Sequence, residues 1–362
     1  MQENQNLTAS SLEGGEHPPF RTGRIPYIDL AKGICILLVV LNHLSIGGYF
    51  SGDDYPMNYI FAQVRMPLYF ILSGLFFKDY QGGIREFLLR KVNRILVPYV
   101  FFLMLYKSAA WFVGRVTSID VTDPGITGIW SPLWFLLCLF WMNVLFSATY
   151  YTVKHFIEEP LLRDITLGAC VLLTGVAGYY VGNVSLYFGT AMTSLPFLWL
   201  GYLLNKRLKF FSLKIRWEAA LLMGLLLLGV LHFTYMGKNL FFRNSYSNPL
   251  AILYLTGLMG TVGILLLSRV VRWLPVVSYV GRYSIIVLCT HMAAMKAVRG
   301  IDIYFIGNQF PAPGLLNSIV VFSLTVACCV VCCWVLSKYL PWFTAQKDLI
   351  KTDFGAKHTD AL

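Results

Sequence analysis

The sequence predicts an all-α protein that crosses a membrane many times. Of its 362 residues, 57% are hydrophobic and only 13% are charged, and the mean hydropathy is +0.63. An ordinary soluble domain has about a quarter of its residues charged. A membrane-crossing helix needs about 20 apolar residues, and the hydrophobic residues suffice for roughly ten such helices. The same composition excludes a disordered chain and a small secreted domain held by disulfides.

Ten apolar stretches are long enough to be spans. In order they cover 28–46, 59–77, 95–114, 130–150, 165–182, 185–204, 218–236, 250–268, 276–297 and 315–340. The division between the fifth and the sixth depends on Gly182-Asn183 alone. We therefore expect one membrane domain at 24–343, flanked by short, polar, solvated tails at 1–23 and 344–362. The first tail has no apolar core, so we expect no cleavable signal peptide.

The net charge of the chain is +11, from 29 Lys and Arg against 18 Asp and Glu. With the N-terminus placed inside, 20 of the basic residues fall in inner loops and tails, five fall in outer loops, and the rest lie in or beside spans. Cytoplasmic loops of membrane proteins carry an excess of Lys and Arg. This rule explains the positive charge without a nucleic-acid partner, and it predicts that both termini are cytoplasmic.

Ionisable side chains inside spans are costly, so each one is a functional candidate. The predicted spans hold His43, Arg65, His232 and His291, and no Asp or Glu lies deep in any of them. Proton-coupled carriers commonly use a relay of intramembrane carboxylates, which this sequence lacks. His232 shares its helix face with no polar residue comparable to the serine seven residues before His291, and we interpret it as structural.

The first span carries charged or titratable groups at both ends. Asp29 and Lys32 lie at its cytoplasmic edge, and His43 lies near its outer end. Eleven residues turn a helix by about 1100°, so Lys32 and His43 share one face, roughly 16 Å apart along the axis. Imidazole is the side chain best suited to proton transfer near neutral pH. A catalytic His43 is therefore expected, and the alternative is an interfacial histidine bonded to water or to a carbonyl.

Two further spans carry a cation and an imidazole in their outer halves. Arg65 lies roughly 9 Å below the outer edge of the second span and stays charged, so it needs an anion, a carbonyl or water. Pro67 is expected to kink the helix beside it. His291 lies as deep in the ninth span as His43 does in the first, on the same face as Ser284. The alternatives are a snorkelling arginine and an outer-interface histidine.

The basic cluster before the third span contains Arg90 and Arg94 at an i, i+4 spacing. Such a pair is suited to binding phosphates, although most clusters of this kind only anchor a protein at the membrane surface. The eight cysteines all lie in apolar stretches. We interpret them as small packing residues and expect no metal site.

Four short motifs follow one another along the chain. They are Arg24 to Gly33 followed by His43, Arg65-Met66-Pro67-Leu68-Tyr69-Phe70 with Ser73-Gly74, Arg90 with Arg94 and Pro98-Tyr99, and Gly281-Arg282-Tyr283-Ser284 followed by His291. Together they resemble the acyltransferase-3 family of integral-membrane acyltransferases over about 24–341. Trp134-Phe135-Leu136 is similar to stand-alone sugar O-acetyltransferases of that family. Too few residues follow the last span for the hydrolase-like domain that many members carry.

The resemblance implies transfer of an acetyl or other short acyl group. The donor is acetyl-CoA or another acyl-CoA from the cytoplasm, used as a substrate and not as a permanently bound cofactor. The acceptor is a hydroxyl of a carbohydrate or glycolipid at the outer face of the cell membrane, a bacterial inner membrane in the usual setting of the family. Contact with membrane lipid is expected as well.

The residues fit this chemistry in named roles. We expect His43 as general base, Arg65 as stabiliser of the oxyanion, and His291 as a residue that holds the acceptor or shares the proton. Donor phosphates are expected at the cytoplasmic side, on Arg24, Lys32, Arg90 and Arg94. Asp29, Ser73 and Ser284 belong to the motifs and are expected near the site.

Three questions stay open. A covalent acetyl-histidine intermediate is an alternative to direct transfer. A transporter or flippase for a lipid-linked sugar is the rival function, and a signalling or scaffolding membrane protein is the third. Binding of acetyl-CoA would separate the acyltransferase function from the transporter and from the signalling or scaffolding protein.

Overall fold

The computed structural model describes residues 25–46, 58–117, 132–302, 305, 307 and 315–351. Within these residues the secondary structure is helical, with one isolated bridge between Leu240 and Ser245 and no strand. Seven helices of the described part are long and apolar enough to cross a membrane, and 59–75 and 217–233 form shorter apolar helices. The prediction of an all-α, multi-pass membrane protein is confirmed. The count of ten spans and the cytoplasmic termini stay predictions.

Each predicted span corresponds to one helix or to a series of two or three consecutive helical segments. The helices are α1 (Pro26–Ile46), α2 (Asn58–Phe61) with α3 (Arg65–Leu75), α4 (Gly83–Lys91) with the π-helical turn η2 (Val92–Leu96) and α5 (Val97–Thr117), α7 (Trp134–Phe156), α8 (Pro160–Val181), α9 (Phe188–Lys206), α10 (Trp217–Phe233), α11 (Leu250–Val271), α12 (Pro275–Arg282) with α13 (Ser284–Ile301), and α14 (Leu315–Tyr339). The division at Gly182 is confirmed, because α8 ends at Val181 and Gly182 has a positive φ of 72°.

The second predicted span is interrupted rather than kinked. Residues 62–64 form a turn, and α3 begins afresh at Arg65. Pro67 lies in the first turn of α3, where backbone N–H groups have no partner inside the helix. The expected kink at Pro67 is therefore absent, and the proline fits the start of a new helix. This break places Arg65 at a helix N-terminus.

Small residues let the central helices approach closely. A Cβ atom on Gly33 of α1 would lie 1.9 Å from the carbonyl oxygen of Val277 on α12, and one on Gly281 would lie 1.8 Å from that of Asp29. A Cβ on Gly201 of α9 would lie 1.9 Å from the carbonyl oxygen of Ile71 on α3. Small residues at crossings of this kind are typical of membrane helix packing. They fix α1 against α12 and α3 against α9.

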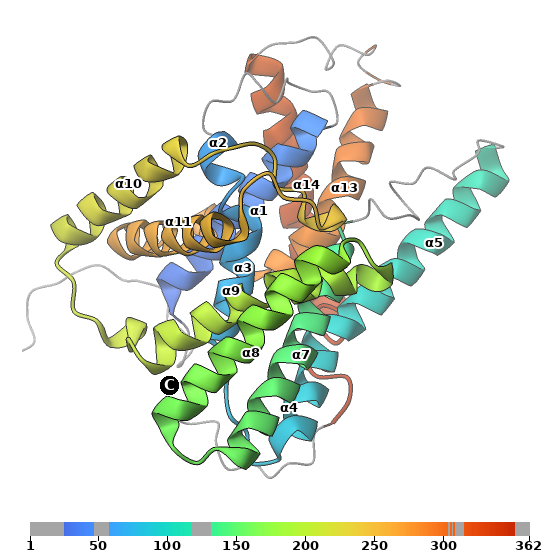
Figure 1. Ribbon diagram of the computed structural model, residues 1–362. Coiled ribbons are helices and arrows are strands. Elements are labelled where there is room, and N and C mark those ends of the chain that lie inside the picture. The colour runs from blue at the N-terminus through green and yellow to red at the C-terminus, as the bar shows by residue number, and fades with distance from the viewer. Residues whose placement is uncertain are drawn as a thin grey trace, which may run out of the picture.

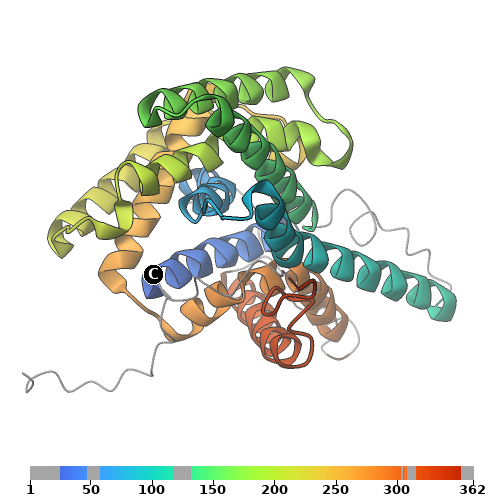
Figure 2. The ribbon, with the colours of Figure 1, turned by 90° about the horizontal axis from the view of Figure 1, so that it is seen from below.

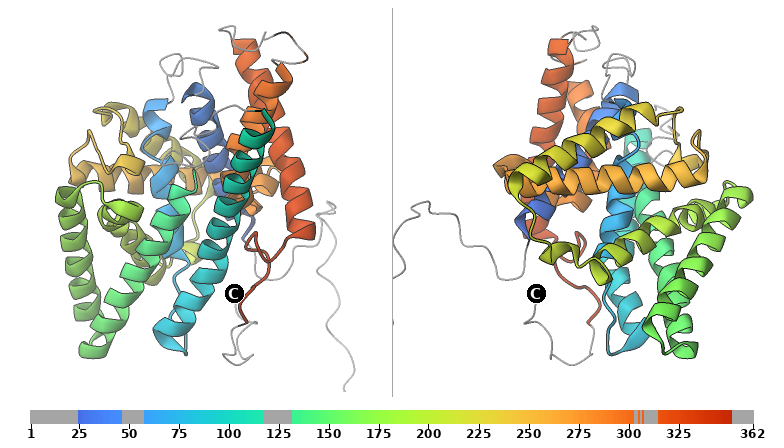
Figure 3. Two further views of the ribbon diagram at one scale, coloured as in Figure 1. Left: turned by 90° about the vertical axis from the view of Figure 1, so that its right-hand side faces the viewer. Right: turned by 60° about the vertical axis from the view of Figure 1, so that its left-hand side comes forward.

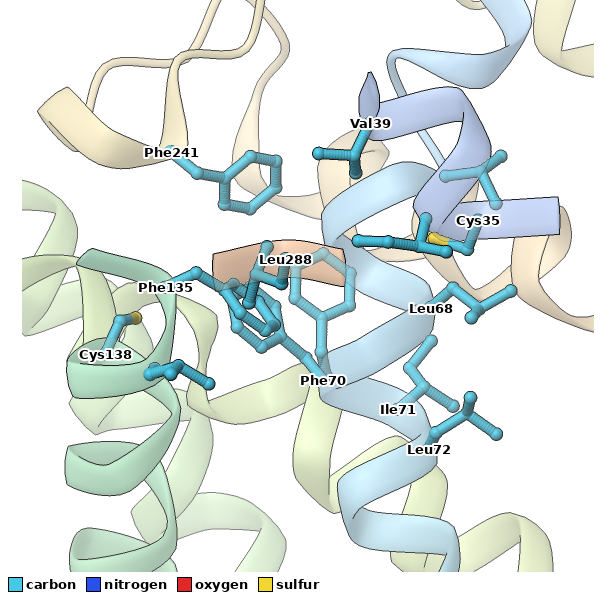
Figure 4. Packing of buried hydrophobic residues seen from close by; sticks show 14 of the residues in the cluster. Cys35, Val39, Leu68, Phe70, Ile71, Leu72, Phe135, Cys138, Phe241 and Leu288 are labelled. Carbon is cyan, nitrogen blue, oxygen red and sulfur yellow. The ribbon is translucent and has the colours of Figure 1, made fainter. Parts of the chain in front are cut away.

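α1 and α3 lie in the middle of the molecule, with α10 and α11 on one side and α13 and α14 on the other (Figure 1). The views in Figure 2 and Figure 3 agree on this arrangement, and Figure 2 shows α5 extending away from the other helices. Aromatic rings fill the space between α3 and α7. Phe70 and Phe135 stack at a centroid distance of 5.2 Å, and Leu288 of α13 lies beside them (Figure 4).

Candidate active site

The two membrane histidines of α1 and α13 meet. Nε2 of His291 lies 3.4 Å from Nδ1 of His43, and the ring centroids are 4.9 Å apart in an edge-to-face arrangement. His291 is fully buried. Equal depth was predicted from the sequence, and the structure brings the two rings into contact.

Backbone carbonyls determine which ring nitrogens carry protons. Nδ1 of His43 lies 2.9 Å from the carbonyl oxygen of Val39, and Nδ1 of His291 lies 3.0 Å from that of Val287. A carbonyl oxygen can only accept, so each Nδ1 is the donor, a tautomer assigned from the bonding pattern. The single Nδ1–H of His43 is then shared, with the Val39 carbonyl oxygen at 2.9 Å as the main acceptor and Nε2 of neutral His291 at 3.4 Å as a second, more distant one. This leaves Nε2 as the basic nitrogen of His43.

Arg65 lies near this pair. Its guanidinium is close enough to His43 for their charges to interact. Its carbonyl oxygen accepts a hydrogen bond of 2.9 Å from the thiol of Cys35, eight residues before His43 on α1. This bond ties the start of α3 to α1. The three residues predicted to be catalytic therefore come from α1, α3 and α13 and gather in one place.

A cavity of about 410 Å³ lies between α1, α3, α4, η2, α7 and α13. Its lining includes four cations, namely Lys32, Arg90, Lys91 and Arg94, and the hydroxyl groups of Tyr69, Ser73, Tyr80 and Ser284. Most of the remaining lining is apolar, from Leu72, Phe76, Ile95, Phe135, Leu136, Leu139, Ile285 and Leu288. A cationic region beside an apolar one suits a ligand with an anionic head and an apolar tail.

The cavity collects most of the residues predicted to bind the donor. Lys32, Arg90 and Arg94 line it. Arg24 lies outside the described residues. Asp29 is not part of the lining; it lies in the first turn of α1, where its carbonyl oxygen faces Gly281 of α12.

Leu288 links the cavity to the histidine pair. It lines the cavity, and it precedes His291 by three residues, or about 4.5 Å along the axis of α13. The Tyr69 hydroxyl, also in the lining, donates to the carbonyl oxygen of Lys32 over 2.9 Å. His43, Arg65 and His291 do not contribute to the lining given by the described residues. Leu288 thus lies at the wall of the cavity, within one helical turn of His291.

Two arginines of the cavity are paired with carboxylates. Arg90 pairs with the buried Glu86 at 2.7 Å, and Arg94 pairs with Asp348 at 3.2 Å. The Arg90 guanidinium also lies over the Tyr80 ring, 4.7 Å from its centroid. Burial raises the pKa of Tyr80, although Arg90 opposes the shift. The phenol stays protonated and can donate a hydrogen bond.

Sequence reasoning missed several residues of this site. Glu86 could have been predicted, because a carboxylate four residues before Arg90 on a helix indicates an ion pair. Lys91 belongs to the basic cluster before the third span, and its position next to Arg90 does not by itself indicate that it lines a cavity. Asp348 gave no signal, since nothing in the chain indicates that a residue after the last span returns to η2.

Ser73 also contacts a residue outside the cavity. Its hydroxyl and the side-chain amide of Asn143 on α7 lie 3.2 Å apart. Asn143 is almost fully buried. The pair joins α3 to α7 at the wall of the cavity and orients the Ser73 hydroxyl.

Comparison with known proteins gives one result. A family model described as an acyltransferase domain matches residues 25–338. Neither a curated protein nor a solved structure matches the chain. The matched region contains His43, Arg65, His291 and the cations of the cavity, and it begins one residue after Arg24.

Proposed function

Because the chain belongs to the acyltransferase-3 family, we propose that it moves an acetyl or other short acyl group from an acyl-CoA to a hydroxyl of a carbohydrate or glycolipid. The protein is a multi-pass membrane acyltransferase. We place it in the cell membrane, with the donor entering from the cytoplasm and the acceptor from the outer face. The observation that carries this proposal is the contact between His43 and His291 beside Arg65.

The proposed reaction is a direct transfer. Nε2 of His43 removes the proton from the acceptor hydroxyl, and the oxygen attacks the thioester carbonyl. The new C–O bond forms as the C–S bond breaks, and the proton passes from His43 to the departing CoA thiolate. The hydrogen bond from Nδ1–H of His43 to His291 strengthens as His43 becomes positively charged. His291 thus shares the charge and holds the ring in position.

Arg65 stabilises the charge that develops on the thioester oxygen. A guanidinium is always charged and offers several donors in a plane. Its position at the start of α3 adds the partial positive charge of a helix N-terminus. The bond from the Cys35 thiol to the Arg65 carbonyl supports this position. Electrostatic stabilisation of an oxyanion is usually a large part of acyl-transfer catalysis.

The cavity is the proposed donor site. Its cations suit the phosphates of CoA, and the hydroxyls of Ser73 and Ser284 suit the amides of the pantetheine arm. The apolar end suits the acyl group. We propose that the side chain of Leu288, three residues before His291 at the cavity wall, moves aside as the thioester reaches His43. Arg24, outside the described residues, is proposed as a further cation for the donor phosphates, and Asp29 as a group that supports the first turn of α1.

The test uses purified protein in nanodiscs with radiolabelled acetyl-CoA. Binding and CoA release would be measured in wild type, His43→Ala and Arg90→Ala. We expect His43→Ala to abolish CoA release without loss of binding, and Arg90→Ala to weaken binding. His232→Ala is the matched control, since the His232 ring packs against Tyr59 of α2 and does not line the cavity.

Each outcome separates the alternatives. Full activity of His43→Ala would refute the role of His43. Failure of folded protein to bind acetyl-CoA would indicate another acyl donor. Failure to bind any acyl-CoA would favour the transporter or flippase. Radiolabel retained on denatured wild-type protein, and absent from His43→Ala, would indicate a covalent acetyl-histidine in place of direct transfer.

A further inference from the structure

The chain after α14 folds back onto the helices that line the cavity. Residues 341–351, which we call the C-terminal strap, lie beside α4 and α5 (Figure 3, left, dark red). A solvated tail was expected from residue 344 onward, but Thr344 is fully buried. Phe343 stacks on Phe101 of α5 with the ring centroids 4.9 Å apart. The strap is therefore a packed part of the protein.

The strap is held by two residues of the π-helical turn η2. The Asn93 side chain donates to the carbonyl oxygen of Ile350 over 2.8 Å. It also accepts from the backbone N–H groups of Leu349 and Ile350 at 3.1 and 2.9 Å. The Arg94 guanidinium donates to the carbonyl oxygen of Ala345. Asn93 thus anchors the backbone of the strap next to the cavity.

The anchored strap carries a carboxylate into the cationic region. Asp348 lines the cavity together with Lys32, Arg90, Lys91 and Arg94. It lies 3.2 Å from the Arg94 guanidinium, with the two side chains 33% and 48% exposed. A carboxylate and a phosphate ester offer a guanidinium the same kind of anionic oxygen. Both cannot occupy one guanidinium face at once.

We propose that Asp348 competes with the phosphates of the donor for Arg94, so that the strap weakens donor binding until the donor displaces this carboxylate. The proposal rests on the proposed function, because the anionic ligand is the acyl-CoA. A partly exposed ion pair contributes less than about 1 kcal/mol, which a ligand with several phosphates can overcome. Asp348 is therefore an affinity-setting residue of the donor site and not a catalytic one.

The test is Asp348→Asn, with the dissociation constant of acetyl-CoA measured in nanodiscs at low and high salt. We expect binding to be about threefold tighter at low salt. The difference should shrink at high salt, because exposed charges are screened. The matched control is Glu218→Gln, which removes the carboxylate of the ion pair with Arg216 at 3.3 Å, away from the cavity.

A second measurement uses the wild-type protein and avoids any folding defect of the variant. Hydrogen–deuterium exchange is followed at the amides of Leu349 and Ile350, which donate to Asn93. We expect saturating CoA to speed their exchange, because displacement of Asp348 loosens the strap.

Unchanged or weaker binding in Asp348→Asn, or unchanged exchange in the wild type, would overturn the competition while leaving the proposed function intact. If wild-type protein binds no acyl-CoA at all, the proposed function itself fails, and the two failures are thereby distinguished.

Discussion

Replacing His291 tests whether this residue supports His43 or acts as a base in its own right. His291→Ala removes the ring whose Nε2 lies 3.4 Å from Nδ1 of His43. His43 keeps its hydrogen bond of 2.9 Å to the Val39 carbonyl oxygen. The basic Nε2 of His43 is therefore retained, and only its charge-sharing partner is lost. The expected result is partial loss of activity, in contrast to the complete loss in His43→Ala.

The size of the loss follows from this hydrogen bond. A hydrogen bond to a charged group contributes about 1.5–3 kcal/mol. The separation of 3.4 Å is longer than the usual range, so the lower half of those values applies. At about 1.4 kcal/mol for each factor of ten, kcat should fall about twelvefold to fortyfold. Loss of a general base costs about 10² to 10⁴ in rate, so the two variants are distinguishable.

The assay is CoA release at saturating acceptor, with kcat and KM for acetyl-CoA determined separately. KM should be unchanged, because His291 does not line the cavity that we propose for the donor. His291→Gln keeps an oxygen acceptor in a side chain of similar length, and it should recover part of the activity lost in His291→Ala. Equal and complete loss in both His291 variants and in His43→Ala would refute a supporting role. Wild-type rates in His291→Ala would refute any role.

Three further predictions concern specificity, packing and pH. Leu288→Ala enlarges the cavity towards His291, so the ratio of kcat/KM for butyryl-CoA to that for acetyl-CoA should rise; an unchanged ratio would show that Leu288 does not limit the acyl group. Gly201→Ala should destabilise the fold by about 1–3 kcal/mol or more, because its Cβ would lie 1.9 Å from the Ile71 carbonyl oxygen. The control is Gly229→Ala, whose Cβ would have no heavy atom within 4 Å. Thermal unfolding in detergent compares the two variants, and equal midpoints would contradict the packing argument. The backbone N–H groups of Leu162 and Leu161 donate to Glu159 at the start of α8 and lower its pKa from the ordinary value of 4.5. A lowered pKa means that this carboxylate stabilises the fold above pH 4.5, and that the stabilisation is lost as the pH falls through the pKa of the folded state. Glu159→Gln should therefore lower the thermal unfolding midpoint at neutral pH and match wild type in acid. A difference between the midpoints that persists in acid would contradict the role of Glu159 as a helix cap.

The sequence was sufficient to predict the helices and the depth of the side chains on them. Long apolar runs identify the helices, and a constant rise per residue places His43 and His291 at the same level. Whether two residues at one level touch depends on which helices are neighbours. That is decided by close crossings such as Gly33 on Val277 and Gly281 on Asp29. Such crossings join segments far apart in the chain and leave no periodic signal.

Breaks and returns of the chain were harder to predict. Pro67 suggested a kink, but the helix ends before Arg65 and restarts, because a proline is better accommodated in a first turn than in the middle. The polar residues after α14 suggested a solvated tail. They return to η2 because the buried Asn93 side chain satisfies three backbone groups of the strap. Hydrogen bonds of this kind depend on tertiary structure and not on hydropathy.

The position of Leu288 at the cavity wall, within one helical turn of His291, has a consequence for the membrane itself. Under the proposed function the enzyme takes a substrate from each side of the bilayer, and it then risks opening a path for ions and protons through its own interior. Here the stacked rings of Phe70 and Phe135 reinforce the same level of the protein. A closely packed apolar layer at this level opposes the passage of ions and protons and so preserves the electrical insulation of the membrane. Such a layer would let the acyl group pass during turnover while the transmembrane potential is maintained.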